Sequence, residues 1–265
     1  MFGAPCLLES IITYLESLSI VERAFIIGLI PAILTSIGTL PVVFIRRREE
    51  LFIDVGLGFS AGIMLVASFT SLLIPASEIA HVGIVIGGFI VGVIFIKALD
   101  MLIPHLHVER GYEGPASLKA KISKAWLIAL AIVVHNVPEG MAVGASSSYT
   151  VRDGLLMALA IGIQDIPEGL AVAIPIALTG SIVKAIIIGV LSGLTEAFSA
   201  TIPAFIVSYI SITLPFVMSL SAGAMIYVVT HEIIPEIMGK GKAEKSTYGF
   251  LVGFLTMFLL DSLLK

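Results

Sequence analysis

Long apolar runs alternate with short polar connectors along almost the whole chain. The runs fall near 22–45, 51–75, 82–103, 124–146, 153–178, 183–208, 214–238 and 246–264. At 1.5 Å per residue, each is long enough to cross the roughly 30 Å hydrocarbon core of a bilayer as a helix. Lipid offers backbone groups no hydrogen-bonding partner, so such segments must be helical. The pattern predicts an all-α polytopic membrane protein with eight transmembrane helices, in one integral membrane domain covering residues 1–265.

Composition supports the same class of protein. Hydrophobic residues make up 58% of the 265 residues and charged residues only 13%, whereas soluble domains carry about 25% charged residues. The formal net charge of −4 gives no indication of a nucleic-acid partner. The first residues lack a basic region followed by a small-residue cleavage site, so we expect a short amphipathic segment there rather than a cleaved signal peptide.

Lys and Arg are distributed unevenly between the connectors. Most follow the first, third, fifth and seventh runs: Arg46, Arg47, Arg48, Arg110, Lys119, Lys121, Lys124, Lys184, Lys240, Lys242 and Lys245. The other connectors and the two ends of the chain carry Arg23, Arg152 and Lys265. Because cytoplasmic loops of membrane proteins are enriched in Lys and Arg, this pattern predicts a multi-pass protein of the cell membrane with both termini outside the cytoplasm.

Small residues recur at four-residue spacing within the runs. Gly83 and Gly87 form one such pair, and Gly140 and Gly144 form another. This spacing lets the backbones of two membrane helices approach closely. We therefore expect both pairs to lie at contacts between helices.

Two related motifs place polar residues in the middle of apolar runs. The fourth run contains 135-HNVPEG-140, and the fifth contains 164-QDIPEG-169. His135 and Glu139 are four residues apart and share one helix face, and the second motif repeats this spacing. The sixth run carries a further acidic residue at its centre. Together the three runs present these polar side chains at similar depth: His135, Asn136, Glu139, Gln164, Asp165, Glu168 and Glu196.

The same motifs carry prolines inside the predicted helices. Pro138 and Pro167 remove a backbone hydrogen bond and are expected to bend their helices, which frees the carbonyls of Val134 and Ile163. One motif written twice on successive antiparallel helices suggests a local two-fold axis in the membrane plane. Transporters built on inverted repeats place their binding sites at such axes.

The energetics of the buried acids favour a bound cation. One ionised carboxylate at the bilayer centre costs about 2.5–3.5 kcal/mol on insertion scales, and four acids share this depth: Glu139, Asp165, Glu168 and Glu196. A divalent metal offsets this cost, because carboxylate, imidazole and amide oxygen are all metal ligands. The donors suit Zn²⁺, Fe²⁺, Mn²⁺ or Cd²⁺ better than Cu⁺. A buried network joining helices and a proton relay are the two alternatives that do not need metal.

At these residues the chain resembles the ZIP (Zrt-, Irt-like protein) family of divalent-metal transporters, in its bacterial and archaeal branch. The resemblance implies eight helices in a 3+2+3 arrangement, in which the first and last three are related by an inverted repeat. It also implies inward transport of metal, frequent homodimers, and a slide of the metal-bearing helices in the manner of an elevator. Many members of the family carry His at the position of Gln164, whose neutral oxygen is a weaker ligand.

The resemblance further implies a site for two metal ions. The first ion would be held by His135, Glu139, Gln164 and Glu168. The second would be held by Asn136, Asp165, Glu168 and Glu196, with Glu139 and Glu168 placed to bridge the ions.

Weaker candidates lie along the route to and from this site. The resemblance places Met64 and Ser71 on the pathway, although alone they are typical of helix packing. Three residues at the end of the third run, Asp100, His105 and His107, are candidates to receive departing metal, or form a plain interfacial helix end. The resemblance marks His231 and Glu232 in 231-HEIIPE-236 as exit-side groups, and a polar helix end at the interface is the alternative. Pro235 stands where a metalloprotease H-E-x-x-H motif needs its second His, which argues against proteolysis.

The sequence thus predicts a carrier of divalent transition metals, with zinc first and cadmium, iron and manganese as further substrates, and without a catalytic cofactor. We do not expect an enzyme. A membrane-embedded di-metal carboxylate enzyme is one alternative, but di-iron bundles favour Glu-x-x-His over the His-x-x-x-Glu found here. A proton-coupled carrier of another substrate is the second alternative.

Overall fold

The computed structural model describes residues 4–44, 50–107, 111–119, 124–178, 181–238 and 243–264, and most of them are helical. The first half contains α1 (Ala4–Glu16), α2 (Ile20–Thr39), η1 (Leu40–Val43), α3 (Glu50–Ala67), η2 (Ser68–Leu73), α4 (Ile74–Ile79), α5 (Val82–Leu102), β1 (His105–His107), β2 (Gly111–Glu113) and η3 (Ala116–Leu118). The second half contains α6 (Lys124–Tyr149), α7 (Val151–Leu178), α8 (Ile182–Tyr209), η4 (Ser211–Thr213), α9 (Leu214–Val228), η5 (Val229–Ile233), α10 (Ile234–Met238) and α11 (Ala243–Leu264).

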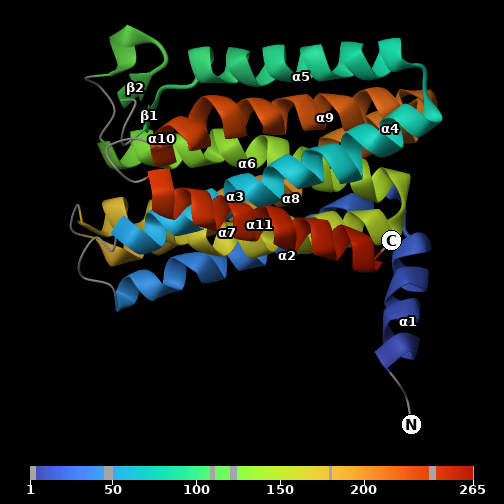
Figure 1. The fold of residues 1–265 in the computed structure, drawn as a ribbon, viewed down its shortest axis with the longest axis horizontal. Coiled ribbons are helices and arrows are strands. Elements are labelled where there is room, and N and C mark those ends of the chain that lie inside the picture. The colour runs from blue at the N-terminus through green and yellow to red at the C-terminus, as the bar shows by residue number, and fades with distance from the viewer. Residues whose placement is uncertain are drawn as a thin grey trace.

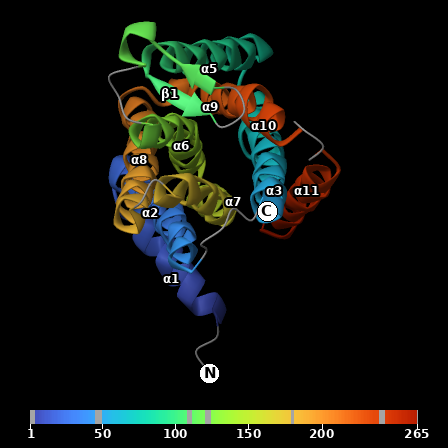
Figure 2. The ribbon, with the colours of Figure 1, turned by 90° about the vertical axis from the view of Figure 1, so that its left-hand side faces the viewer.

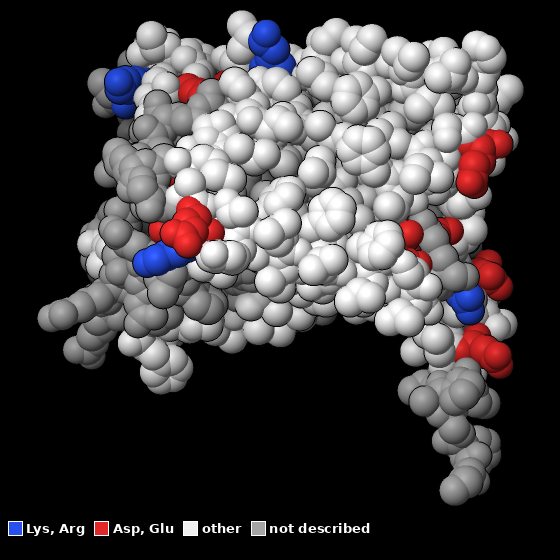
Figure 3. All heavy atoms as spheres, viewed as in Figure 1, with Lys and Arg blue, Asp and Glu red and all other residues white. Residues whose placement is uncertain are grey.

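Apolar helices long enough to cross a membrane account for most of the predicted spans. Seven are found among the described residues, at Ile20–Val43, Ile53–Ile79, Val82–Leu102, Val151–Leu178, Ile182–Tyr209, Ser211–Met238 and Ala243–Leu263. Figure 3 shows an uncharged band between charged side chains that lie toward two ends of the visible face. The chain is therefore an all-α multi-pass membrane protein. The predicted fourth span is not among the seven, but its residues form α6, a helix of 26 residues.

The helices pack in three units. Helices α2, α6, α7 and α8 form a four-helix bundle, which we call the motif bundle because α6 and α7 carry the two polar motifs. Helix α3 packs along α11, and α5 packs along α9. Figure 2 views the helices end-on and separates the motif bundle from the other two pairs. Helix α1 extends from the bundle at the end of the molecule that also holds the C-terminus (Figure 1).

Glycines allow the closest contacts inside these units. A Cβ added at Gly140 would lie 2.2 Å from the carbonyl oxygen of Glu196, and one at Gly144 would lie 2.0 Å from that of Ala200. The expected contact of this pair is therefore confirmed, since α6 and α8 touch through their backbones. The other pair differs, because a Cβ at Gly87 would meet nothing within 4 Å.

Two transmembrane helices change helix type before a proline. In the second span, the π-helical η2 ends just before Ile74 and Pro75, and in the seventh span the π-helical η5 ends just before Ile234 and Pro235. A proline has no N–H for the carbonyl four residues back, and π-helical turns are frequent at functional sites. By contrast, α6 and α7 run through Pro138 and Pro167 without such a change.

A short hairpin stands in the long connector before α6, which the apolar pattern did not predict. Strands β1 and β2 pair antiparallel, with His105 opposite Glu113. Gly111 and Gly114 have φ values of 89° and 106°, a left-handed region that glycine adopts without a steric cost. The hairpin lies at the end of the bundle opposite the C-terminus, which we call the hairpin end (Figure 1).

Candidate metal centre

The polar motifs of α6 and α7 meet α8 in the middle of the motif bundle. The side chains that are almost fully buried there are Asn136, Glu139, Gln164, Asp165 and Glu196. One carboxylate oxygen from each of Glu139, Asp165 and Glu196 lies within 4.8 Å of the other two. We call these three residues the carboxylate trio. Their spacing matches ligand atoms that share a cation.

Amide side chains donate hydrogen bonds to two members of the carboxylate trio, at one oxygen of each. Gln164 Nε2 donates to Glu139 Oε1 at 2.7 Å. Asn136 Nδ2 donates to Glu196 Oε1 and also to the carbonyl oxygen of Ser192, the latter at 3.2 Å. Hydrogen bonds of this kind fix the direction of a carboxylate and leave its second oxygen for another partner.

Several buried oxygens of these side chains have no hydrogen-bond partner among the described residues. Among the described residues, these buried atoms have no hydrogen-bond partner: Glu139 Oε2, Gln164 Oε1, Asp165 Oδ2, Glu168 Oε1 and Glu196 Oε2. A buried polar atom without a partner costs free energy, and a cluster of acceptors without donors costs more. A cation bound between them would satisfy all of them at once.

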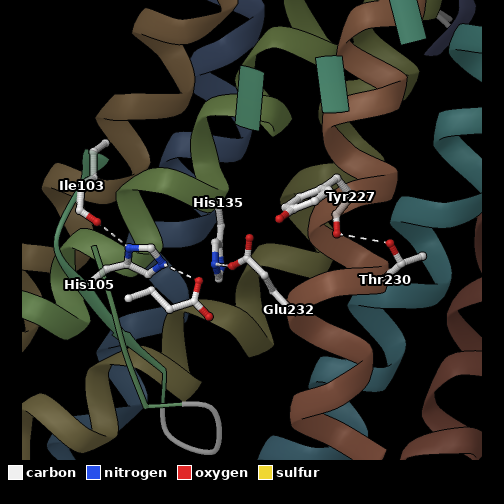
Figure 4. A network of polar contacts seen from close by, with 7 residues as sticks. Ile103, His105, His135, Tyr227, Thr230 and Glu232 are labelled. Carbon is white, nitrogen blue, oxygen red and sulfur yellow. Dashed lines mark hydrogen bonds and ion pairs between the residues drawn. The ribbon is translucent and has the colours of Figure 1, made fainter. Parts of the chain in front are cut away.

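His135 is turned away from the trio. Its Nε2 forms an ion pair with Glu232 Oε2, which comes from η5 outside the motif bundle (Figure 4). His135 also lies close enough to Glu168 and Asp100 to interact with their charges. Glu168 is half-buried, within hydrogen-bonding reach of Ser60 on α3. The structure thus places His135 and Glu168 between the trio and the hairpin end.

A pocket of about 350 Å³ opens beyond this pair, and we call it the hairpin pocket. It is lined by Lys97, Asp100, Met101, Glu113, Gly114, Tyr227 and His231. The predicted exit residues Asp100 and His231 therefore share one cavity. The ring of His231 packs on that of Tyr227 with centroids 4.7 Å apart. Sequence analysis did not identify Glu113 or Tyr227, because neither lies in a motif.

The other pathway candidates have different surroundings. His105 is buried in the hairpin, where its Nδ1 lies 2.7 Å from the carbonyl oxygen of Ile103 and its Nε2 lies 3.9 Å from Glu113 Oε2 (Figure 4). The backbone of His107 pairs with Gly111, and its side chain lies outside the described residues.

Met64 and Ser71 lie on the second span, away from the hairpin. Met64 is fully buried. The Ser71 hydroxyl, in the π-helical η2, donates to Asp261 Oδ1 on α11 at 3.1 Å. In this arrangement Ser71 takes part in a contact between η2 and α11, and the structure does not bring it to the trio.

Comparison with known proteins shows which family the chain resembles over most of its length. Residues 104–261 match the family model described as ZIP zinc transporter. The chain is 39% identical to the zinc transporter ZIPB of Bordetella bronchiseptica over 243 residues, which are 87% of this chain and 77% of that protein. It is 35% identical to the zinc transporter GufA of Myxococcus xanthus over 253 residues, covering 88% and 97% of the two chains. It is 32% identical to the zinc transporter ZupT of Clostridium perfringens over 273 residues, covering 91% and 96%. The chain therefore belongs to the ZIP family.

Proposed function

We propose that this protein carries zinc and related divalent metals across the membrane into the cytoplasm, by way of the carboxylate trio. The observation that carries the proposal is a group of buried oxygens from α6, α7 and α8. Among the described residues these oxygens have no hydrogen-bond partner, and the three carboxylates lie close together. The relatives are named as zinc transporters, which supports transport rather than enzymatic turnover. Cadmium, iron and manganese are further candidate substrates, because they accept the same oxygen and nitrogen donors.

Two ions bind at this centre in our proposal. His135, Glu139, Gln164 and Glu168 hold the first, and Asn136, Asp165, Glu168 and Glu196 hold the second. The buried trio supports the second set, since it includes both Asp165 and Glu196. For the first set, His135 must leave Glu232 and turn toward Glu139.

The helix arrangement supports a 3+2+3 plan with an inverted repeat, in a single domain that covers residues 1–265. In this plan α6 is the fourth span. Under the repeat, spans one, two and three correspond to spans six, seven and eight. The first and sixth spans, α2 and α8, pack together, while the second packs on the eighth and the third on the seventh. The π-helical turns before Pro75 and Pro235 fall in the two corresponding spans.

The hairpin end is the cytoplasmic end in this proposal. Metal leaving the centre passes His135 and Glu232 into the hairpin pocket, where Asp100 and His231 receive it. His105 and His107 continue this route, while Met64 and Ser71 line the approach from the other side. Both termini are outside the cytoplasm, and two copies of the chain form a homodimer.

Cysteine labelling tests this orientation. In a Cys6→Ser background, which has no other cysteine, Ser211→Cys should react with a membrane-impermeant maleimide on intact cells. Ser117→Cys should react only after permeabilisation. Both positions are exposed, and they lie at η4 and η3. The reverse labelling pattern would contradict the orientation.

Metal flux tests the function itself. Proteoliposomes that hold a trapped zinc-sensitive dye should show rapid, saturable zinc uptake, and liposomes without protein should not. If no zinc uptake is measured, cadmium, iron and manganese are tested in the same way. If no metal moves although metal copurifies at the centre, the enzyme alternative is favoured. Flux driven by pH without any dependence on metal would favour a proton-coupled carrier of another substrate.

A further inference from the structure

We infer that Thr35 is a positioning residue of the metal centre, which fixes the carboxylate of Glu196, beside that of Asp165, for the second ion. The inference rests on the proposed function and adds a residue from α2, a helix that no sequence motif connects with metal. Thr35 lies in an apolar stretch and is 3% exposed.

The backbone of α2 lies tightly against both helices that supply these carboxylates. A Cβ added at Gly38 would lie 2.5 Å from the carbonyl oxygen of Ile166 on α7. On α8, a Cβ at Gly193 would lie 2.4 Å from the carbonyl oxygen of Ala32. Thr35 sits between these two points along α2. Because α2 lies this close, the short side chain of Thr35 reaches the site. A more distant helix would need a longer side chain.

The Thr35 hydroxyl donates to one oxygen of the Glu196 carboxylate. Its Oγ1 lies 2.8 Å from Glu196 Oε1, the atom that also accepts the Asn136 amide. Glu196 Oε2 has no hydrogen-bond partner among the described residues. Two donors on Oε1 thus direct Oε2 toward the metal. Asp165 lies beside the same hydroxyl, so Thr35 sits next to two of the proposed ligands of one ion.

The hydroxyl has one hydrogen, and acceptor oxygens of Glu196, Asp165 and Pro31 lie near it. Thr35 Oγ1 also lies 2.9 Å from the carbonyl oxygen of Pro31, one turn earlier in α2. Hydrogen bonds to an ionised carboxylate are roughly twice as strong as bonds between neutral groups. An ionised Glu196 therefore draws the hydrogen away from Pro31. The helix loses little, because the Pro31 contact is a side-chain addition to its backbone hydrogen bonds.

The test compares Thr35→Val with Thr35→Ser. Valine keeps the shape and removes the hydroxyl, whereas serine keeps the hydroxyl. Zinc stoichiometry and affinity are measured on purified full-length protein by titration calorimetry and elemental analysis, and uptake is measured in proteoliposomes. We expect wild type and Thr35→Ser to bind two ions. In Thr35→Val, the second ion should be lost or bound about 10- to 100-fold less tightly. This is the usual effect of removing a group that orients a metal ligand.

Thr39→Val is the matched control. Thr39 is fully buried one turn further along α2, and its hydroxyl donates at 2.7 Å to the carbonyl oxygen of Ser36 in its own helix. This variant loses the same chemical group in the same helix and should bind two ions as wild type does. If Thr39→Val loses an ion as well, the effect belongs to the stability of α2 and the inference is wrong.

Other outcomes separate this inference from the proposed function. If wild type binds two ions and Thr35→Val binds them with unchanged affinity, Thr35 has no positioning role although the carrier proposal stands. If wild type neither binds nor moves metal, the proposed function fails and the inference fails with it. Should Thr35→Val not fold, Thr35→Ser against Thr35→Ala compares the presence and absence of the hydroxyl, and equal zinc binding by those two variants would overturn the inference.

Discussion

Zinc uptake by Glu168→Ala should fall by about 100-fold or more relative to wild type. In our proposal Glu168 bridges both ions, so the substitution removes a ligand from each at once. Loss of a group that only orients a ligand already costs about 10- to 100-fold in metal affinity or activity. The initial rate of uptake into proteoliposomes, measured over a range of zinc concentrations, gives the size of the effect.

Two further variants make this experiment decisive. Glu168→Gln keeps the size of the side chain and removes its charge, and it should also be strongly impaired. Glu9→Ala makes the same change as the main variant at an exposed position on α1, and it should transport as wild type does. A Glu168→Ala protein with the wild-type rate and KM would remove Glu168 from the site.

Gly140→Ala should disrupt the metal centre through the backbone. The new Cβ would lie 2.2 Å from the carbonyl oxygen of Glu196 and 2.8 Å from its Cα, distances that real Cβ atoms do not adopt. Helices α6 and α8 must move apart, and the contact between Asn136 and Glu196 is lost with the movement. Overpacking of this kind costs about 1–3 kcal/mol in the free energy of unfolding. We expect a lower Tm in detergent and little or no zinc uptake.

Gly87→Ala is the control for the change of residue type. It makes the same substitution within a transmembrane helix, at a position where the added Cβ meets nothing within 4 Å. Its Tm and uptake should match wild type. Equal loss in the two variants would mean that alanine acts through something other than the contact between α6 and α8.

The apolar pattern was sufficient for the membrane helices because each of them must satisfy its backbone internally and face lipid. Seven of the predicted spans have counterparts among the described helices, with ends shifted by a few residues. Membership of the ZIP family was also predicted correctly, from the two motifs on α6 and α7. These features are local, since they depend on the residues of one helix at a time.

Other features, which depend on contacts between distant residues, were not predicted. Thr35 is separated from Glu196 by 161 positions, and no motif near it in the sequence indicates a function for its hydroxyl. The pairing of His135 with Glu232 likewise depends on how η5 packs beside α6. Pro75 and Pro138 show the same limit, because similar prolines accompany a π-helical turn in one helix and none in the other.

The placement of the glycines also determines which helices can shift past one another. Backbone approaches join α2 to α7 and α8, and α6 to α8, and others join α3 to α11 and α5 to α9. Sliding by one residue inside any of these pairs would drive a side chain into a neighbouring backbone. Between α3 and α7, by contrast, the close contact at Gly56 is with the ring of Pro167. At this glycine the two helices meet through a side chain rather than through two backbones, so a shift of α3 along α7 would meet the proline ring instead of a helix backbone.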